Sequence, residues 1–151
     1  MDLLDYQIVA QLIANARSSY TQIGNIVGLS APAVKRRVDK LLDAGVLRGF
    51  TAVVDPGALG WGTEAFVEVH CRGNVSPSRL RTDLIPLPEV VAAYTVSGAA
   101  DAIVHLRAGS IAHLETVLER LRAVAFVDRT VSTMVLSTLL ERPPHGAPSP
   151  S

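Results

Sequence analysis

The sequence has little that points to a disulfide, a metal site or a membrane. Its single cysteine, Cys71, excludes a disulfide within the chain and fits a reducing compartment, so we expect a cytoplasmic protein. The four histidines have no metal-ligand spacing with that cysteine, which predicts no metal site. No apolar run approaches the roughly 18 residues that cross a bilayer. The start of the chain carries Asp2 and Asp5 instead of the basic region of a signal peptide.

Catalytic motifs and net charge are missing as well. There is no nucleophile–base motif, phosphate-binding loop or paired-carboxylate arrangement, so the sequence predicts neither an enzyme nor a cofactor. The charges of the 14 basic and 14 acidic side chains cancel, so the formal net charge is zero. This argues against a protein whose whole surface is basic for binding nucleic acid, but it allows a local basic surface. Such a surface is indicated between residues 28 and 50, where five of the fourteen Lys and Arg residues lie.

Periodic apolar residues predict three helices in the first third of the chain, over residues 2–16, 21–27 and 30–45. A glycine ends the second helix and another ends the third. Ser30 fits the N-cap of the third helix, and Pro32 falls in its first turn, where a missing N–H costs little. Three helices with a glycine-containing turn between the last two are typical of a helix-turn-helix unit.

The third predicted helix leaves its basic side chains beside or opposite its apolar stripe. A recognition helix places its N-terminal half in the major groove and cations near phosphates. A solvated helix face is the alternative explanation, and Asp39 and Asp43 dilute the charge. The turn, the short preceding helix and a further arginine beyond the helix favour contact with double-stranded operator DNA. The predicted DNA-binding residues are Ser30, Ala31, Pro32, Lys35, Arg36, Arg37, Lys40 and Arg48.

The segment after the third helix predicts a strand and then a domain boundary. Residues 46–55 have strand composition, and "DPGALGWG" over 55–62 is rich in turn residues. The tail "RPPHGAPSPS" is rich in Pro, Ser and Gly, which predicts disorder. We therefore predict a helix-turn-helix domain over 1–55, a linker over 56–62, a second domain over 63–140 and a disordered tail over 141–151.

The second half alternates strand and helix patterns in the order β-α-β-β-α-β, which is the split ferredoxin-like arrangement of an α+β fold. Its helices begin at Ser76-Pro77 and after Ser110. The strands are predicted over 65–72, 89–97, 102–108 and 127–139. RNA-recognition domains share this order but need stacking aromatics on the central strands, and "ADAIVHLRA" has none.

Two helices cover only one face of such a sheet. The strand over 89–97 is apolar on both of its faces, and 48% of the whole chain is hydrophobic, a high fraction for so small a protein. The uncovered face is therefore expected to pack on another subunit.

Four stretches of the chain form a recognisable combination. They are "DLLDYQIVAQL" and "YTQIGNIVGLSAPAVKRRVDKLLDAGVLRGFTAVVDPGALG" in the N-terminal half, and "YTVSGAADAIVHL" and "VDRTVSTMVL" in the C-terminal half. With them, the sequence resembles the Lrp/AsnC transcription regulators over residues 2 to about 140. This resemblance implies a winged-type helix-turn-helix joined to a "regulation of amino acid metabolism" domain. It also implies a homodimer that assembles into larger rings, an octamer among the candidates, and an amino acid as effector. Arg37, Val38 and Leu41 match the family's Arg-Val-x-x-Leu pattern, whereas Ala31-Pro32-Ala33 departs from it and leaves the base preference open.

The hairpin "VSGAAD" over 96–101 has two interpretations. Gly98 can take a positive φ and Asp101 can bind backbone amides, so the pattern alone favours a tight turn. The family resemblance implies instead that this loop lies beside the amino-acid pocket between subunits. The residues implied as effector-binding are Gly98, Ala99, Ala100, Asp101, Thr130, Ser132 and Thr133. Ala102 stands where the family commonly has an aromatic residue, so the pocket is expected to be wider, altered in specificity or absent.

The helix-turn-helix pattern predicts a DNA-binding protein. The family resemblance implies a sequence-specific transcriptional regulator whose oligomeric state or DNA binding responds to a small effector, an amino acid. The alternative is an architectural DNA-binding protein of the same fold that senses no ligand.

Overall fold

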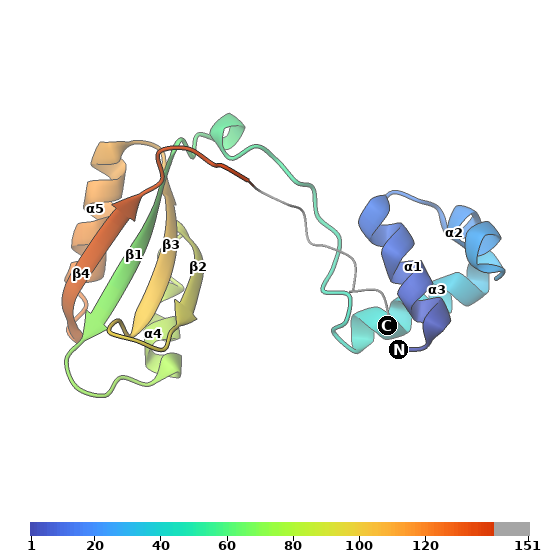
Figure 1. Cartoon of the computed structure of the whole chain (residues 1–151), viewed down its shortest axis with the longest axis horizontal. Coiled ribbons are helices and arrows are strands. Elements are labelled where there is room, and N and C mark those ends of the chain that lie inside the picture. Colours follow the sequence, from blue (N-terminus) through green and yellow to red (C-terminus); the bar gives the residue numbers. More distant parts are fainter. Residues whose placement is uncertain (141–151) are drawn as a thin grey trace. The chain divides into compact units, whose positions relative to one another are not determined.

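The computed structural model describes residues 1–140, which form two compact units, Met1–Ala52 and Val53–Leu139 (Figure 1). The tail predicted to be disordered, over 141–151, lies outside the described residues.

The first unit consists of the helices α1 (Leu3–Ala14), α2 (Tyr20–Val27) and α3 (Ala31–Asp43). Polar side chains fix where the first two begin: Asp2 and Asp5 form a capping box on α1, and Ser19 forms one with Gln22 on α2. One apolar residue stripe from each helix faces the others. The buried core consists of Ile8, Leu12, Ile23, Val34 and Val38.

Two glycines shape the turn between α2 and α3. Gly28 ends α2 in the left-handed conformation, with a φ of 73°. Gly24 is buried, and a Cβ there would lie 2.3 Å from the carbonyl oxygen of Leu29. This close approach of two backbone segments sets the crossing of α2 and α3, so the predicted helix-turn-helix is confirmed.

The prediction of a strand over 46–55 is wrong. The N–H groups of Val46 and Leu47 both donate to the carbonyl of Leu41, which turns the backbone at the end of α3. The following residues have no strand pairing within residues 1–140, and Val53 is 95% exposed. Strand composition alone does not make a strand, because the backbone needs a neighbouring strand to bind. A short 3-10 turn, Gly57–Leu59, leads into the second unit.

The second unit is a four-stranded antiparallel sheet with two helices, in the predicted order β-α-β-β-α-β. Its elements are β1 (Thr63–Cys71), α4 (Pro77–Leu84), β2 (Val90–Thr95), β3 (Ala102–Ala108), α5 (Ile111–Arg122) and β4 (Val127–Met134). The strands lie in the order β2-β3-β1-β4, so β1 and β3 are central. The last strand ends at Met134, short of the predicted residue 139.

Both helices lie on the same face of the sheet (Figure 1). Strand β3 shows the difference between the two faces most clearly. Val104 and Leu106 are fully buried under the helices, whereas the alternate residues Ile103, His105 and Arg107 are only half-buried. The opposite, open face carries large apolar side chains, among them Phe66, Tyr94 and Val131, which are 43%, 59% and 40% exposed. The prediction of a face that no helix covers is confirmed.

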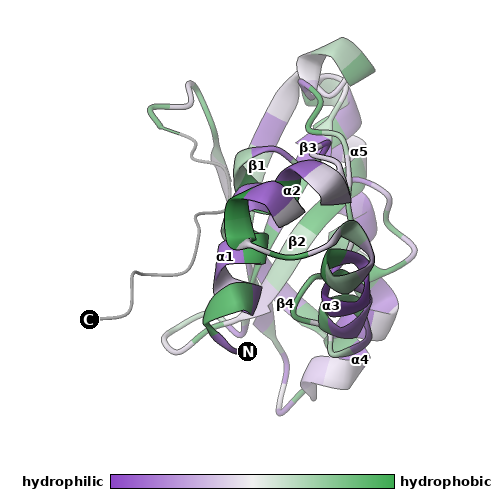
Figure 2. Ribbon diagram, turned by 90° about the vertical axis from the view of Figure 1, so that its right-hand side faces the viewer, coloured by the Kyte–Doolittle hydropathy of each residue, from purple (hydrophilic) through white to green (hydrophobic). Residues whose placement is uncertain are grey.

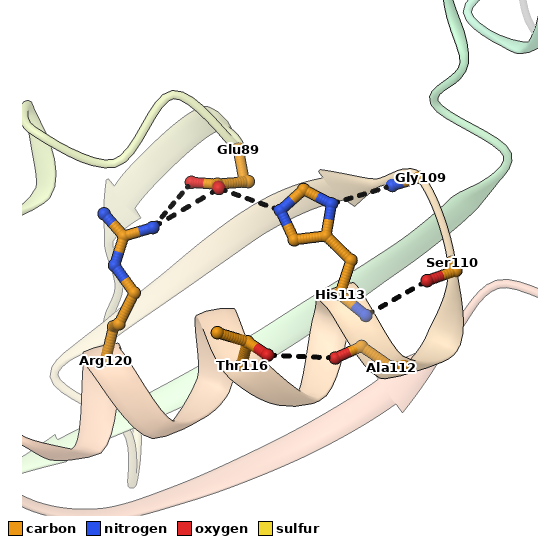
Figure 3. Close-up of polar contacts among 7 residues, drawn as sticks. All are labelled: Glu89, Gly109, Ser110, Ala112, His113, Thr116 and Arg120. Carbon is orange, nitrogen blue, oxygen red and sulfur yellow. Dashed lines mark hydrogen bonds and ion pairs between the residues drawn. The ribbon is translucent and has the colours of Figure 1, made fainter.

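A buried carboxylate ties α5 to the start of β2 (Figure 3). Glu89 is 5% exposed, and its carboxylate lies 3.0 Å from His113 Nε2 and 3.3 Å from Arg120 Nη1. The amide of Gly109 donates to His113 Nδ1, so the ring's other nitrogen carries the proton that Glu89 accepts. Burial acts to raise the pKa of Glu89, but its backbone amide, His113 and Arg120 outweigh burial and lower it below 4.5.

Candidate DNA-binding and effector sites

The basic side chains of α3 form an exposed polar surface, and hydrophilic residues follow the helix in Figure 2. Lys35, Arg36 and Lys40 are exposed on α3, and Arg48 is exposed just beyond it. Ser30 occupies the N-cap position but its hydroxyl makes no capping hydrogen bond, and the residue is exposed. A free hydroxyl at a helix N-terminus can bind a phosphate oxygen, where the helix dipole also favours negative charge.

Lys35 forms an ion pair on this surface without being buried by it. Its ammonium lies 2.7 Å from Asp39 one turn later, with the two side chains 61% and 48% exposed. The hydrogen bond to Asp39, together with that residue's charge, raises the pKa of Lys35, so it stays a cation. An exposed pair of this kind contributes little to stability, and DNA phosphates can compete for the lysine.

Arg37 of α3 is bound by two carboxylates of α1. Its guanidinium Nη1 donates to Asp2 and to Asp5, each at 2.7 Å, and its side chain is 28% exposed. The two carboxylates belong to the capping box of α1, so Arg37 fastens α3 to the start of α1. These bonds raise the pKa of Arg37, and the Asp5 amide and then Arg37 lower the pKa of Asp2. These contacts hold α3 against the start of α1, and the role of Arg37 in DNA binding stays a prediction.

Small residues occupy the first turn of α3. Ala31 is half-buried and Pro32 is exposed, and the proline sits at a position where the helix has no N–H partner to lose. Because their side chains are small, the N-terminus of α3 has room to approach a DNA backbone closely.

The hairpin loop between β2 and β3 borders a hollow of about 570 Å³ on the open face of the sheet. It is lined by residues 95–100, by Glu68 of β1 and by Ile103 of β3. Gly98 has a φ of 142°, a conformation that favours glycine. The amides of Gly98, Ala99 and Ala100 donate no hydrogen bond within residues 1–140. They are free to bind an anion such as a carboxylate.

Asp101 is bound to β1. Its own amide donates to the carbonyl of Val69 at 2.9 Å, and its carboxylate Oδ2 accepts the amide of Cys71 at 2.7 Å. Burial and then the nearby charge of Asp101 raise the pKa of the Cys71 thiol. Asp101 does not line the hollow. Its observed contacts are those of a residue that closes the hairpin against the sheet.

The predicted hydroxyl residues of β4 are divided between the two faces of the sheet. Thr133 lies opposite Phe66 on the open face, whereas Thr130 and Ser132 lie opposite Val69 and Val67, whose side chains pack under the helices. Thr130 accepts a hydrogen bond from Arg122 Nε of α5 at 3.0 Å. None of the three hydroxyls lines the hollow. Their role in effector binding stays a prediction.

Sequence reasoning missed several residues that line the hollow, Glu68 and Ile103 among them. The period of two along β1 places Glu68 on the same face as Phe66, which is a signal that the residue is not in the core. Only the pairing register, in which Glu68 lies opposite Ile103 of β3, brings it to the hairpin. That register joins segments 35 residues apart and cannot be read from either strand alone.

The described residues show neither a membrane span nor a metal cluster. Within residues 1–140, no helix is long and apolar enough to cross a bilayer. In the same part of the chain, no group of three or more His, Cys, Asp or Glu side chains could hold a metal ion.

A helix-turn-helix unit followed by a small α/β unit with a candidate ligand site defines a class, the DNA-binding regulators that carry their own ligand-binding domain. Family comparison agrees: residues 1–42 match the AsnC-type helix-turn-helix domain, and residues 64–145 match the Lrp/AsnC ligand binding domain. The chain belongs to the Lrp/AsnC family of transcriptional regulators.

Individual relatives extend this result over nearly the whole chain. The HTH-type transcriptional regulator Rv2324 of Mycobacterium tuberculosis is 51% identical over 144 residues, covering 95% of this chain and 97% of the relative. The crystal structure of M. tuberculosis LrpA is 32% identical, covers 97% of this chain and 100% of its own, and has a TM-score of 0.87. A feast or famine regulatory protein of M. tuberculosis complexed with L-methionine has a TM-score of 0.88 at 32% identity, with 97% and 99% covered.

Proposed function

We propose that this protein binds operator DNA through α3 and changes its assembly or DNA affinity when an amino acid binds beside the hairpin over 96–101. The observation that carries the proposal is the exposed surface of α3. There, a free N-cap hydroxyl and three exposed cations lie on the outer side of a helix-turn-helix. Lys35, Arg36 and Lys40 would contact phosphates or base edges, with Arg48 on the flanking backbone.

The second unit supports a homodimer formed through the open face of its sheet. A face with Phe66, Tyr94 and Val131 exposed leaves apolar surface in water unless another subunit covers it. On that face the carboxylate of Glu64 contacts His105 and lies 3.6 Å from Arg107 Nε, which lowers the cost of burying these three residues. A second copy of the same face is the partner that fits, and larger rings, up to an octamer, would form from such dimers.

The free amides of the hairpin support an amino-acid effector. Gly98, Ala99 and Ala100 offer donors for a carboxylate at the edge of a hollow large enough for an amino acid. The solved relative complexed with L-methionine favours the same class of ligand. An architectural regulator that senses no ligand is the competing function, and the free amides are the feature it leaves without a role.

DNA binding is tested with the triple variant Lys35→Ala, Arg36→Ala, Lys40→Ala, using a duplex selected from a random pool by the wild-type protein. Fluorescence anisotropy should show affinity lower by at least about 100-fold and a salt dependence reduced by about one unit of slope per lost phosphate contact. The control replaces Arg79, Arg81 and Arg122 of α4 and α5 with Ala, which changes the net charge equally. Unchanged binding by a folded α3 variant would refute the assignment.

A further inference from the structure

The effector site as predicted from the sequence contains one carboxylate, Asp101, and the structure places it away from the hollow. Its Oδ2 accepts the Cys71 amide at 2.7 Å, and the residue does not line the hollow. Among the residues that do line it, Glu68 is the single carboxylate. On the basis of the proposed function, we infer that Glu68 binds the ammonium group of the effector, and that the effector is an amino acid with an uncharged side chain.

The position of Glu68 suits this role. It lies on the central strand β1, opposite Ile103 of β3 and Val131 of β4, and its side chain is 51% exposed on the open face. A carboxylate that is exposed to water loses little hydration free energy in the absence of ligand, so it is readily kept charged. It can then accept a charge-assisted hydrogen bond from an ammonium group. The hollow thus has amide donors on the hairpin and an acceptor on the neighbouring strand.

His70 connects these two sides of the hollow. One ring nitrogen, Nδ1, lies 3.0 Å from the carbonyl oxygen of Ala99, and the other, Nε2, lies 3.5 Å from the carboxylate of Glu68. The histidine side chain is only 12% exposed, so its ring is held in place. This contact fixes the distance between the hairpin and Glu68, as recognition of both charged ends of one small zwitterion requires.

The rest of the lining disfavours a charged side chain. Val96, Ala99, Ala100 and Ile103 are apolar, Thr95 and Ser97 carry hydroxyls, and the lining contains no Lys or Arg. An acidic side chain would lie near the negative charge of Glu68, since Arg129 contacts His70 and does not line the hollow. A basic side chain would compete with the ammonium group for the same carboxylate, whereas an uncharged one leaves no charge unpaired.

The test measures binding of the full-length protein to matched pairs of probes that differ only in the ammonium group. The probes are L-methionine with 4-(methylthio)butanoate, and L-leucine with 4-methylpentanoate, titrated by calorimetry. Glu68→Gln should bind the better of the two amino acids roughly 10- to 100-fold more weakly than the wild type, because it loses a charge-assisted bond. Its affinity for the matching analogue should stay within about threefold, since the analogue has nothing for Glu68 to bind.

The control variant is Glu115→Gln, which removes an exposed carboxylate from α5 and should leave all affinities unchanged. If Glu68→Gln binds the amino acid as tightly as the wild type, or loses the analogue to the same extent, Glu68 does not bind the ammonium group. If the wild type binds no uncharged amino acid but binds a charged one in a thermal-shift screen of the common amino acids, this inference is wrong and the proposed function stands. If it binds none in that screen, the amino-acid response itself is wrong.

Discussion

At the scale of single residues, the position of Arg37 changes what its replacement should do. In the sequence it looks like one cation of a DNA-binding run, but in the structure it is held by Asp2 and Asp5 of α1. Arg37→Ala should therefore lower the melting temperature and weaken DNA binding by displacing α3. Asp5→Asn, a change on α1 in the same cluster, should reproduce both effects in melting curves and anisotropy titrations. Full DNA affinity in Asp5→Asn with lost affinity in Arg37→Ala would show that Arg37 reads a base directly.

Glu89 makes stability depend on pH in a definite direction. Its folded-state pKa is lowered below 4.5, so its carboxylate contributes stability above about pH 4.5 and loses that contribution as pH falls through the lowered value. We expect Glu89→Gln to cost about 1–2 kcal/mol at pH 7, since the half-exposed His113 and Arg120 can turn to water. Urea unfolding of both proteins from pH 7 to pH 3 should show this difference shrinking below pH 4.5. A constant difference would refute the ionic role.

At the scale of elements, Asp101 joins the β2–β3 hairpin to β1. Asp101→Asn should lower the melting temperature and leave amino-acid affinity within about threefold, because its carboxylate binds the Cys71 amide and does not line the hollow. The same change removes a charge that raises the pKa of the Cys71 thiol. The folded variant should therefore react faster than the wild type with a thiol reagent near pH 8. Equal reaction rates together with lost ligand binding would place Asp101 in the effector site instead.

The elements that the sequence predicts well are those set by local chemistry. Ser76 and Ser110 cap α4 and α5 as expected, since a capping side chain acts within three residues of its own position. Contacts that join distant segments are not predictable in this way. The Arg37–Asp5 pair spans 32 residues, and the register that takes Thr130 and Ser132 away from the hairpin depends on how β1 and β4 align. The residues around 53 have strand composition, but within residues 1–140 they have no neighbouring strand to pair with.

At the scale of the whole molecule, each unit exposes surface that has no binding partner within a single copy of the described residues. The first unit exposes the cations of α3, and the second exposes apolar side chains and an open hollow on the uncovered sheet face. A dimer of the kind proposed would cover the sheet face and the open side of the hollow, and it would carry two copies of α3. Ligand binding at such an interface and DNA binding by the pair are then linked through assembly.

That link is the central claim, and one measurement tests it most directly. The wild-type protein is titrated onto its selected DNA duplex with and without saturating L-methionine and L-leucine, and sedimentation follows assembly in the same samples. We predict that at least one of the two amino acids shifts the DNA affinity or the association constant of the oligomer by about fivefold or more, the lower end of a typical coupling. In Glu68→Gln the shift should require a higher amino-acid concentration. Identical DNA titration curves and sedimentation profiles with and without both amino acids, in a protein that binds one of them, would contradict the account.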